Sequence, residues 1–232
     1  MILNTIKPEY FRCERKFLIT SIGHHEIQSI IRFHPYAFSQ IYSPRTINNI
    51  YLDSPDMQAY RDNLIGISNR VKVRIRWYGE TFGIIEKSVL ELKIKQGLFG
   101  SKISFPLNRF TLDNHFSIAA QQNTFLESNI PNFLIEPLKS LGFVLLNNYQ
   151  RSYYESADHK FRITLDTGLE FYHIDSNENY FIERCIKRQI AILELKYDHE
   201  YDEEARFITN RLPFRMTKSS KYVMGIESVY GY

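Results

Sequence analysis

The chain alternates charged and apolar residues over several short stretches, and a period of two is the pattern of a β-strand. The clearest stretch is RVKVRIRWYG at 70–79, where Arg or Lys fills every second position from Arg70 to Arg76. Successive side chains of a strand point to opposite faces, so one face of this strand is entirely cationic. Because like charges repel, we expect an anion opposite that face.

The same division into one apolar and one charged face recurs in FRCERKFLI, KSVLELKIK, SKISF, FRITLD and AILELKYD. A sheet with its polar face in water would explain such alternation. However, these faces carry Arg and Glu repeatedly, whereas solvent faces usually mix Thr, Ser, Gln and Lys. The tripeptide Glu-Leu-Lys also occurs twice in the same strand phase, at 91–93 and 194–196. If the sheet closes with its charged faces inward, a barrel of about eight strands can enclose a ligand cavity.

The order of predicted elements gives the fold class. Strands are predicted at 10–19, 47–53, 70–78, 87–96, 101–106, 144–154, 160–173 and 189–198, with a hairpin at 97–100. Helices are predicted at 24–33, 54–66, 133–141 and 202–212, the second with Ser54 as N-cap, Pro55 in the first turn and Gly66 at its end. No linker or repeat divides the chain, so we expect a single domain over 1–232. The expected class is α+β, an antiparallel β-barrel with accessory helices packed outside.

Composition adds limits to this prediction. The 232 residues are 44% hydrophobic and 15% aromatic, which suits a sizeable core rich in β structure. The net charge is only +3, so a strong field must come from where the charges lie. Cys13 and Cys185 are predicted to be buried thiols rather than a disulfide. We expect no signal peptide, no membrane span and a cytoplasmic protein.

The charges on the predicted inward faces are mainly positive. The candidate cations are Lys16, Lys72, Arg74, Arg76, Lys93, Lys102, Arg151, Arg162 and Lys196, and the candidate acids are Glu14, Glu91, Asp166 and Glu194. The excess of about five positive charges suits a triphosphate or a longer phosphate chain, because Arg and Lys both bind phosphate oxygens. The few carboxylates would suit Mg²⁺ or Mn²⁺, which bind through one or two carboxylates together with substrate phosphates.

Several motifs in order resemble a known family. ERKFLI is similar to the opening ExExK motif of the triphosphate tunnel metalloenzymes, which include the CYTH phosphatases. YLDSPDMQAYRDNL, KVRIRWYG, ELKIK, NYQRSYYE, LDTGLEF, LELKYD and SSKYVMG resemble the VTC domain more narrowly, the polyphosphate polymerase branch. The resemblance covers nearly the whole chain.

The resemblance implies an antiparallel tunnel that binds nucleoside triphosphate and inorganic polyphosphate with a divalent metal, Mn²⁺ or Mg²⁺. The family reaction it implies is transfer of the γ-phosphate onto a growing polyphosphate chain. Together with the charge pattern, it indicates catalytic roles for Arg74, Arg76, Lys93, Arg151 and Lys221. It indicates substrate binding by Lys16, Lys102, Tyr149, Lys196 and Ser220, and metal binding by Glu194, Glu91 and Glu14.

One departure separates the chain from the hydrolytic CYTH enzymes. The first Glu of ExExK is Arg12 here, so a carboxylate that those enzymes use for metal is missing, which favours the polymerase branch. Two alternatives stay open, a tripolyphosphatase or triphosphatase on the same scaffold and a non-catalytic polyphosphate-binding module. Nucleic acid is not expected as a partner, because Trp77, Phe161 and Tyr197 fall on the apolar faces. A membrane-bound partner and the oligomeric state are left open.

Overall fold

The computed structural model describes residues 12–97, 99–174, 179, 181 and 183–231. The prediction about a signal peptide and the start of the first predicted strand concern residues 1–11, which lie outside this range. The strands are β1 (Cys13–Ile19), β2 (Ser39–Asp53), β3 (Asn69–Tyr78), β4 (Gly83–Ile85), β5 (Ser88–Gln96), β6 (Phe99–Leu107), β7 (Phe110–Leu112), β8 (Gly142–Glu155), β9 (Arg162–Tyr172), β10 (Arg184–Lys187) and β11 (Ala191–Tyr197). The helices are α2 (His24–Arg32), α3 (Gln58–Ile65), α4 (Ile118–Glu127), α5 (Asn132–Lys139), the short 3₁₀ helix η1 (His199–Tyr201), α6 (Asp202–Asn210) and α7 (Lys221–Tyr230).

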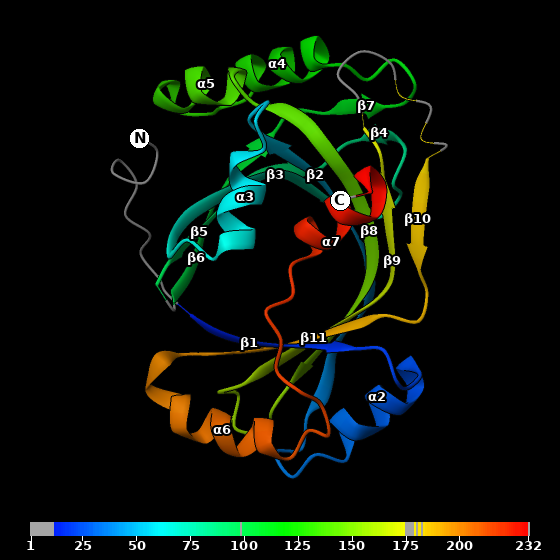
Figure 1. The fold of residues 1–232 in the computed structure, drawn as a ribbon, viewed down its shortest axis with the longest axis vertical. Helices are drawn as coiled ribbons and strands as arrows, with labels where there is room; N and C mark the ends of the chain where they lie inside the picture. The colour runs from blue at the N-terminus through cyan, green and yellow to red at the C-terminus, as the bar shows by residue number, and fades with distance from the viewer. Residues whose placement is uncertain (1–11, 98, 175–178, 180, 182, 232) are drawn as a thin grey trace.

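One large antiparallel sheet dominates the molecule, with strand order β1-β11-β9-β8-β2-β3-β5-β6 and β10 beside β9. The sheet curls around a central space (Figure 1), which brings its two edge strands together. At this seam Arg12 and Gly100 exchange backbone hydrogen bonds of 3.2 and 3.3 Å. The predicted α+β class and antiparallel sheet are confirmed. Among the described residues the edges meet at this one bridge, so the sheet forms a curled tunnel and not a barrel closed along its length.

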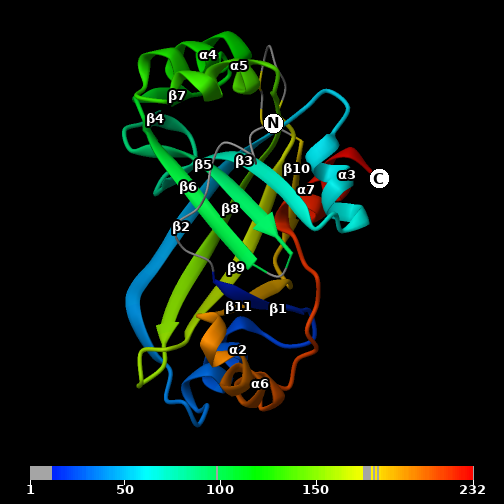
Figure 2. The same ribbon diagram turned by 90° about the vertical axis from the view of Figure 1, so that its left-hand side faces the viewer.

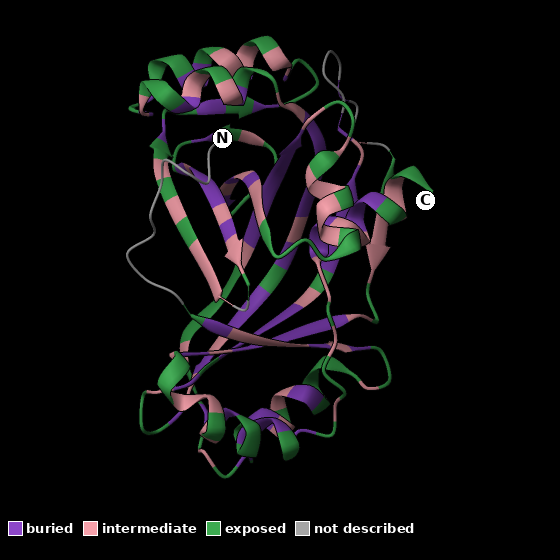
Figure 3. Cartoon of the chain, turned by 60° about the vertical axis from the view of Figure 1, so that its left-hand side comes forward, coloured by how far each residue is buried: buried purple, intermediate pink, exposed green. Residues whose placement is uncertain are grey.

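The outer face of the sheet is apolar and is covered in two places. At one end, Ile27 and Ile31 of α2 and Ala205 and Ile208 of α6 pack on strands β1, β9 and β11. At the other end, α4 and α5 cover strands β3 and β5 through Phe125, Leu134 and Leu138. Buried residues accordingly follow the strands, and exposed residues follow the outer sides of the helices (Figure 3).

Helix α7 departs from the prediction of helices packed only outside. It packs on the inner face of the sheet, where Tyr222 and Ile226 join a cluster with Leu145 and Phe171. The approach is close at Gly225, where a Cβ would lie 2.4 Å from a methyl of Leu145 and 2.6 Å from the ring of Phe171. Glycine is therefore needed here for the helix to rest against β8 and β9.

The predicted helices are confirmed with changed ends. Helix α3 begins at Gln58, and Ser54 and Asp53 cap it together, because Ser54 Oγ accepts from the Gln58 N–H at 3.1 Å. The Asp53 carboxylate accepts hydrogen bonds from the backbone N–H groups of Ser54, Ala59 and Tyr60 at 2.8–3.0 Å. Gly66 ends α3 in the left-handed conformation, as predicted. Helices α4 and α7 were not predicted, and α5 ends three residues before Gly142, which begins β8.

Two further expectations concern cysteines and membranes. Cys13 and Cys185 are both free thiols, the first buried and the second half-buried. In the part of the chain that the structure describes, no helix combines the length and apolar character needed to cross a membrane.

Candidate functional site

A cavity of about 900 Å³ lies inside the curled sheet. Its charged lining residues are the cations Arg12, Lys16, Lys72, Arg74, Arg76, Lys93, Lys102, Arg151, Lys196 and Lys221 and the acids Glu14, Glu91 and Glu194. The lining thus carries ten cations and three carboxylates, an excess of seven positive charges. Every predicted site residue lines this cavity, including Tyr149 and Ser220. Their shared location is a finding, whereas their separate roles stay predictions.

Three residues of the predicted charged faces lie outside the cavity lining. Arg162 lies at the start of β9 and pairs with Glu155 of the neighbouring strand at 2.9 Å, with about half of its side chain exposed. Arg70, the first cation of the stretch at 70–79, donates to the carbonyl of Ile67 in the preceding loop. Arg162 and Arg70 are therefore outside the cavity lining. Arg162 does share the face of its cross-strand partner Lys196, as predicted, but it lies beyond the cavity. Asp166 is fully buried behind the lining rather than in it.

Strands β3, β5 and β6 form one wall of the cavity, the Glu91 wall. Glu91 is 1% exposed and its Oε2 accepts from Arg74 Nε at 2.7 Å, while Lys102 Nζ lies 2.9 Å from Oε1. Arg76 Nη1 is farther away, 3.8 Å from Oε2. Burial opposes ionisation of Glu91, but these three cations lower its pKa below the usual range. Glu91 thus holds Arg74 in place, and Arg76 is less fully neutralised.

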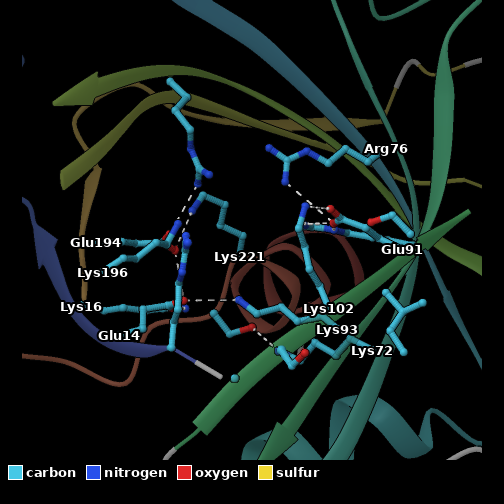
Figure 4. Close-up of a pocket in the computed structure, with 18 of the residues that line it drawn as sticks. Glu14, Lys16, Lys72, Arg76, Glu91, Lys93, Lys102, Glu194, Lys196 and Lys221 are labelled. Carbon is cyan, nitrogen blue, oxygen red and sulfur yellow. Dashed lines mark hydrogen bonds and ion pairs between the residues drawn. The ribbon is translucent and has the colours of Figure 1, made fainter. Parts of the chain in front are cut away.

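Strands β1 and β11 form the second wall, the Glu194 wall (Figure 4). Glu194 is surrounded by Lys196 at 2.9 Å, Lys16 at 3.5 Å, Arg151 at 3.6 Å and Lys221 at 3.7 Å. Burial acts against its ionisation, but Lys196 and Lys16 lead the cations that lower its pKa well below the ordinary value. One carboxylate cannot neutralise four cations, so this wall keeps positive charge that can bind an anion.

Glu14 completes the Glu194 wall. Lys16 Nζ lies 2.6 Å from a Glu14 oxygen and 3.5 Å from Glu194, so the two carboxylates share one cation. Lys93 reaches Glu14 at 3.7 Å from the opposite side of the seam. Glu14 favours the charged form of Lys93, but repulsion from Lys16 and burial lower the pKa of Lys93 to about 8.

Arg151 and Lys221 are fixed from behind by Asp166. Two Arg151 nitrogens lie 2.5 and 2.6 Å from the two Asp166 oxygens, and Lys221 Nζ lies 2.5 Å from Asp166. Both cations also lie over the ring of Tyr149, at 5.3 and 4.8 Å from its centre. The bidentate pair fixes the plane of the Arg151 guanidinium toward the cavity. Asp166 was named as an inward acid but not as a site residue, and its supporting role follows only from the structure.

Lys72 has a different environment from the other lining cations. Its Nζ donates to Ser220 Oγ at 2.9 Å and lies 5.8 Å from the ring centre of Tyr222. Burial and repulsion, first from Lys93 and Lys16, lower the pKa of Lys72 well below its ordinary value. An anion in the cavity would relieve this repulsion and favour the charged lysine.

The carboxylates only partly fit the predicted metal site. No group of three or more His, Cys, Asp or Glu side chains among the described residues is placed to hold a metal ion. Glu14 and Glu194 are adjacent through Lys16, and two carboxylates with substrate phosphates are a ligand set that Mg²⁺ and Mn²⁺ use. Glu91 lies on the other wall with three cations of its own and does not join them (Figure 4).

Several lining residues were not predicted. Tyr51, Tyr78 and Tyr153 contribute aromatic surface to the cavity. Tyr51 extends the inner face of β2, and Tyr153 follows Arg151 by two positions on β8, so strand alternation could have found Tyr153.

Comparisons with known proteins agree on the fold. The model of one protein family, described as the VTC domain, matches residues 11–230. A search among curated proteins returned no match. Among solved structures, the PH1819 protein from Pyrococcus horikoshii is 13% identical with a TM-score of 0.52, covering 93% of this chain and 98% of its own. A candidate adenylyl cyclase from Hippeastrum, described as having a dominant triphosphatase activity, is 14% identical with a TM-score of 0.51, covering 93% of this chain and 94% of its own.

A third solved structure, a candidate adenylate cyclase from Vibrio parahaemolyticus, is 10% identical with a TM-score of 0.52 and covers 92% of this chain and 97% of its own. At these identities the likeness establishes a shared fold. The three proteins and this chain therefore have the same curled antiparallel sheet.

Proposed function

The chain belongs to the VTC domain family, as its motifs predict, and on this premise we propose that it is a metal-dependent enzyme acting on phosphoanhydrides. Specifically, it transfers the γ-phosphoryl group of a nucleoside triphosphate to the end of an inorganic polyphosphate chain. The observation that supports this most is the enclosed lining with seven excess positive charges. The cations of this lining repel one another when the cavity is empty, and the negative charges of a phosphate chain would offset that repulsion.

The proposed reaction breaks the bond between the γ-phosphorus and its bridging oxygen and forms one to a terminal oxygen of the acceptor chain. Nucleoside diphosphate leaves with the bridging oxygen, and no covalent bond to the enzyme forms. Arg74, Arg76, Lys93, Arg151 and Lys221 align the donor and acceptor and offset the charge on the transferred group. Lys16, Lys102, Lys196, Tyr149 and Ser220 hold the rest of the chain in register.

A divalent metal, Mn²⁺ or Mg²⁺, would be held by Glu194 with Glu14 and would polarise the phosphoryl oxygens. The carboxylates present suit this role, because both lie on the same wall and share Lys16. Lys196 and Lys16 would remain beside the bound phosphates and keep both carboxylates ionised.

Hydrolysis is the second candidate reaction. The Hippeastrum protein of the same fold is described with a dominant triphosphatase activity. On this scaffold water would replace the polyphosphate end as acceptor. The cationic lining would serve both reactions, because both transfer the same group.

The test is turnover of ATP by the full chain with Mn²⁺ or Mg²⁺, measuring polymer length and released phosphate in the same samples. Metal-dependent growth of polyphosphate is the expected result, and chelation of the metal should stop it. Released phosphate without polymer would replace the polymerase proposal by the hydrolase. Tight ATP or tripolyphosphate binding without turnover would leave a binding module and overturn the enzymatic proposal.

A further inference from the structure

An arginine surrounded by tyrosines borders the cavity, and we call this group the tyrosine rim: Tyr42 and Arg45 of β2, Tyr78 of β3 and Tyr153 of β8. The guanidinium carbon of Arg45 lies 5.0 Å from the ring centre of Tyr42 and 5.8 Å from those of Tyr78 and Tyr153. Tyr42 and Tyr153 also meet edge to face, with centres 5.7 Å apart. Three strands thus contribute to one cluster of π faces around one cation.

Two tyrosines of the rim are exposed. Tyr42 is 51% exposed and Tyr78 is 52% exposed, although tyrosines normally bury most of their ring. Tyr78 and Tyr153 line the cavity itself. The rim therefore carries tyrosines that are exposed to solvent and border the tunnel.

The other tyrosines of the lining do not offer such surface. Tyr51 is buried and stacks on Tyr222 with ring centres 4.9 Å apart. Tyr149 is buried under Arg151 and Lys221. Among the lining tyrosines that the structure describes, the exposed aromatic surface is on the rim.

The rim is continuous with the phosphate-facing cations. The Arg76 guanidinium carbon lies 5.4 Å from the ring centre of Tyr78, and Arg76 lines the cavity. Arg45 is the cross-strand partner of Arg151. The stretch of β2 that carries the rim bows out on the side of the tunnel opposite α3 and α7 (Figure 2). A triphosphate held by Arg76 and Arg151 would extend its nucleoside toward this side.

Arg45 has a planar guanidinium that could stack on a planar ligand. This arginine is exposed, no carboxylate lies within 4 Å of it among the described residues, and its guanidinium lies beside the three tyrosine rings. Tyrosine rings and guanidinium planes both stack on nucleobases. A bare phosphate chain needs cations but gains nothing from aromatic faces.

Resting on the proposed function, we propose that the tyrosine rim is the subsite for the base of the nucleoside triphosphate, on the side of the tunnel opposite α7. Stacking accepts every base, because each base has a π face. The rim should therefore bind adenine and guanine nucleotides alike.

The experiment is calorimetric titration of the full chain with ATP and with tripolyphosphate, for the native protein and for Tyr78→Ala and Tyr42→Ala. We expect ATP to bind about tenfold or more weakly in these variants, while tripolyphosphate changes by no more than about twofold. Tyr78→Phe keeps the ring and should bind both ligands as the native protein does. Phe207→Ala removes a 61% exposed aromatic from the outer helix α6 and is the matched control.

The outcomes separate the two proposals. Unchanged ATP affinity in both alanine variants, or equal losses for ATP and tripolyphosphate, would overturn the rim as a base subsite while leaving the phosphate tunnel intact. A native protein that binds neither ligand would contradict the proposed function itself.

Discussion

The two walls of the tunnel contain the same kinds of side chains but combine them differently. On the Glu91 wall one buried carboxylate is held by Arg74, Arg76 and Lys102. On the Glu194 wall two carboxylates, Glu194 and Glu14, share Lys16. The Glu91 wall thus fixes Arg74 in place, whereas the Glu194 wall brings two carboxylates together around Lys16.

This difference separates two uses of acids in a cationic site. A carboxylate that stands alone among cations compensates buried charge and orients its partners, so its loss should be felt mainly in stability. Two neighbouring carboxylates repel each other, and together with substrate phosphates they can bind a metal ion beside the lysine that they share. The walls should therefore respond differently to the same Glu→Gln change.

The largest effect is expected for Glu194→Gln. Metal-dependent turnover of ATP should fall by at least about a hundredfold, because the amide is a poor ligand for the metal that offsets the phosphoryl charge. Tripolyphosphate binding without metal should persist, since the lining cations remain. Glu203→Gln, at an exposed position of α6, is the control. Full activity of Glu194→Gln would show that the metal assignment is wrong.

Glu91→Gln should act on stability instead. Removing a carboxylate that is 1% exposed leaves Arg74 and Arg76 buried without their partner, which should lower the free energy of unfolding by about 3–5 kcal/mol. Urea unfolding measures this loss, and tripolyphosphate should recover part of it. The metal concentration for half-maximal activity should not change. If Glu91→Gln were as stable as the native protein but needed a different metal concentration, Glu91 would be a metal ligand. The proposed difference between the two walls would then be wrong.

Gly225→Ala should have an intermediate effect at the helix that carries Lys221 into the cavity. The added methyl meets Leu145 and Phe171, so α7 must move away from β8 and β9, at a cost of about 1–3 kcal/mol. Because Ser220 and Lys221 begin this helix, tripolyphosphate should also bind more weakly. Native affinity in a destabilised Gly225→Ala protein would mean that α7 does not position the two residues.

The smallest effect concerns the pH dependence of stability at Lys72. The pKa of Lys72 lies well below 10.5 in the folded protein. Burial lowers it most, followed by repulsion from Lys93, Lys16, Arg70 and Arg74. Between those two pKa values the unfolded chain binds a proton that the folded chain does not. The free energy of unfolding should therefore rise with pH in that interval.

Lys72→Met should reduce this rise, as measured by urea unfolding at pH 8 and pH 10. Bound tripolyphosphate should reduce it as well, because the anion restores the proton to Lys72. An identical pH slope in the native and Lys72→Met proteins would contradict the placement of Lys72 among repelling cations.

The regular strands are the part of the site that sequence could predict. Strand parity alone places Arg74, Arg76, Glu91 and Glu194 on shared faces, because β3, β5 and β11 pair without register shifts. Parity places Arg162 on the face of its partner Lys196, but it cannot show that this strand end lies beyond the cavity, where the side chain reaches solvent and pairs with Glu155. The direction of curling, which turns those faces inward, was inferred from the charges.

Other parts of the site carry no periodic signal. Lys221 and Ser220 came from the family resemblance. They lie at the start of helix α7, whose packing on the inner face depends on the distant Leu145 and Phe171. The tyrosine rim lies where β2 shifts register around Tyr42 and Arg45, so alternation could not assign their faces. Parity places Asp166 on the inward face, but it cannot show that this acid lies behind Arg151 and Lys221 and outside the lining.

The claim on which the account depends is that the charged faces converge on one enclosed space built for phosphate chains. The most direct test is the melting temperature of the native protein with tripolyphosphate and, separately, with sodium chloride at equal ionic strength. An anion at a hundredfold its dissociation constant adds about 2.7 kcal/mol, which for a chain of this size raises the melting temperature by roughly 5–10 °C. We predict that rise for tripolyphosphate and little change for chloride, and equal shifts in the two salts would contradict the account.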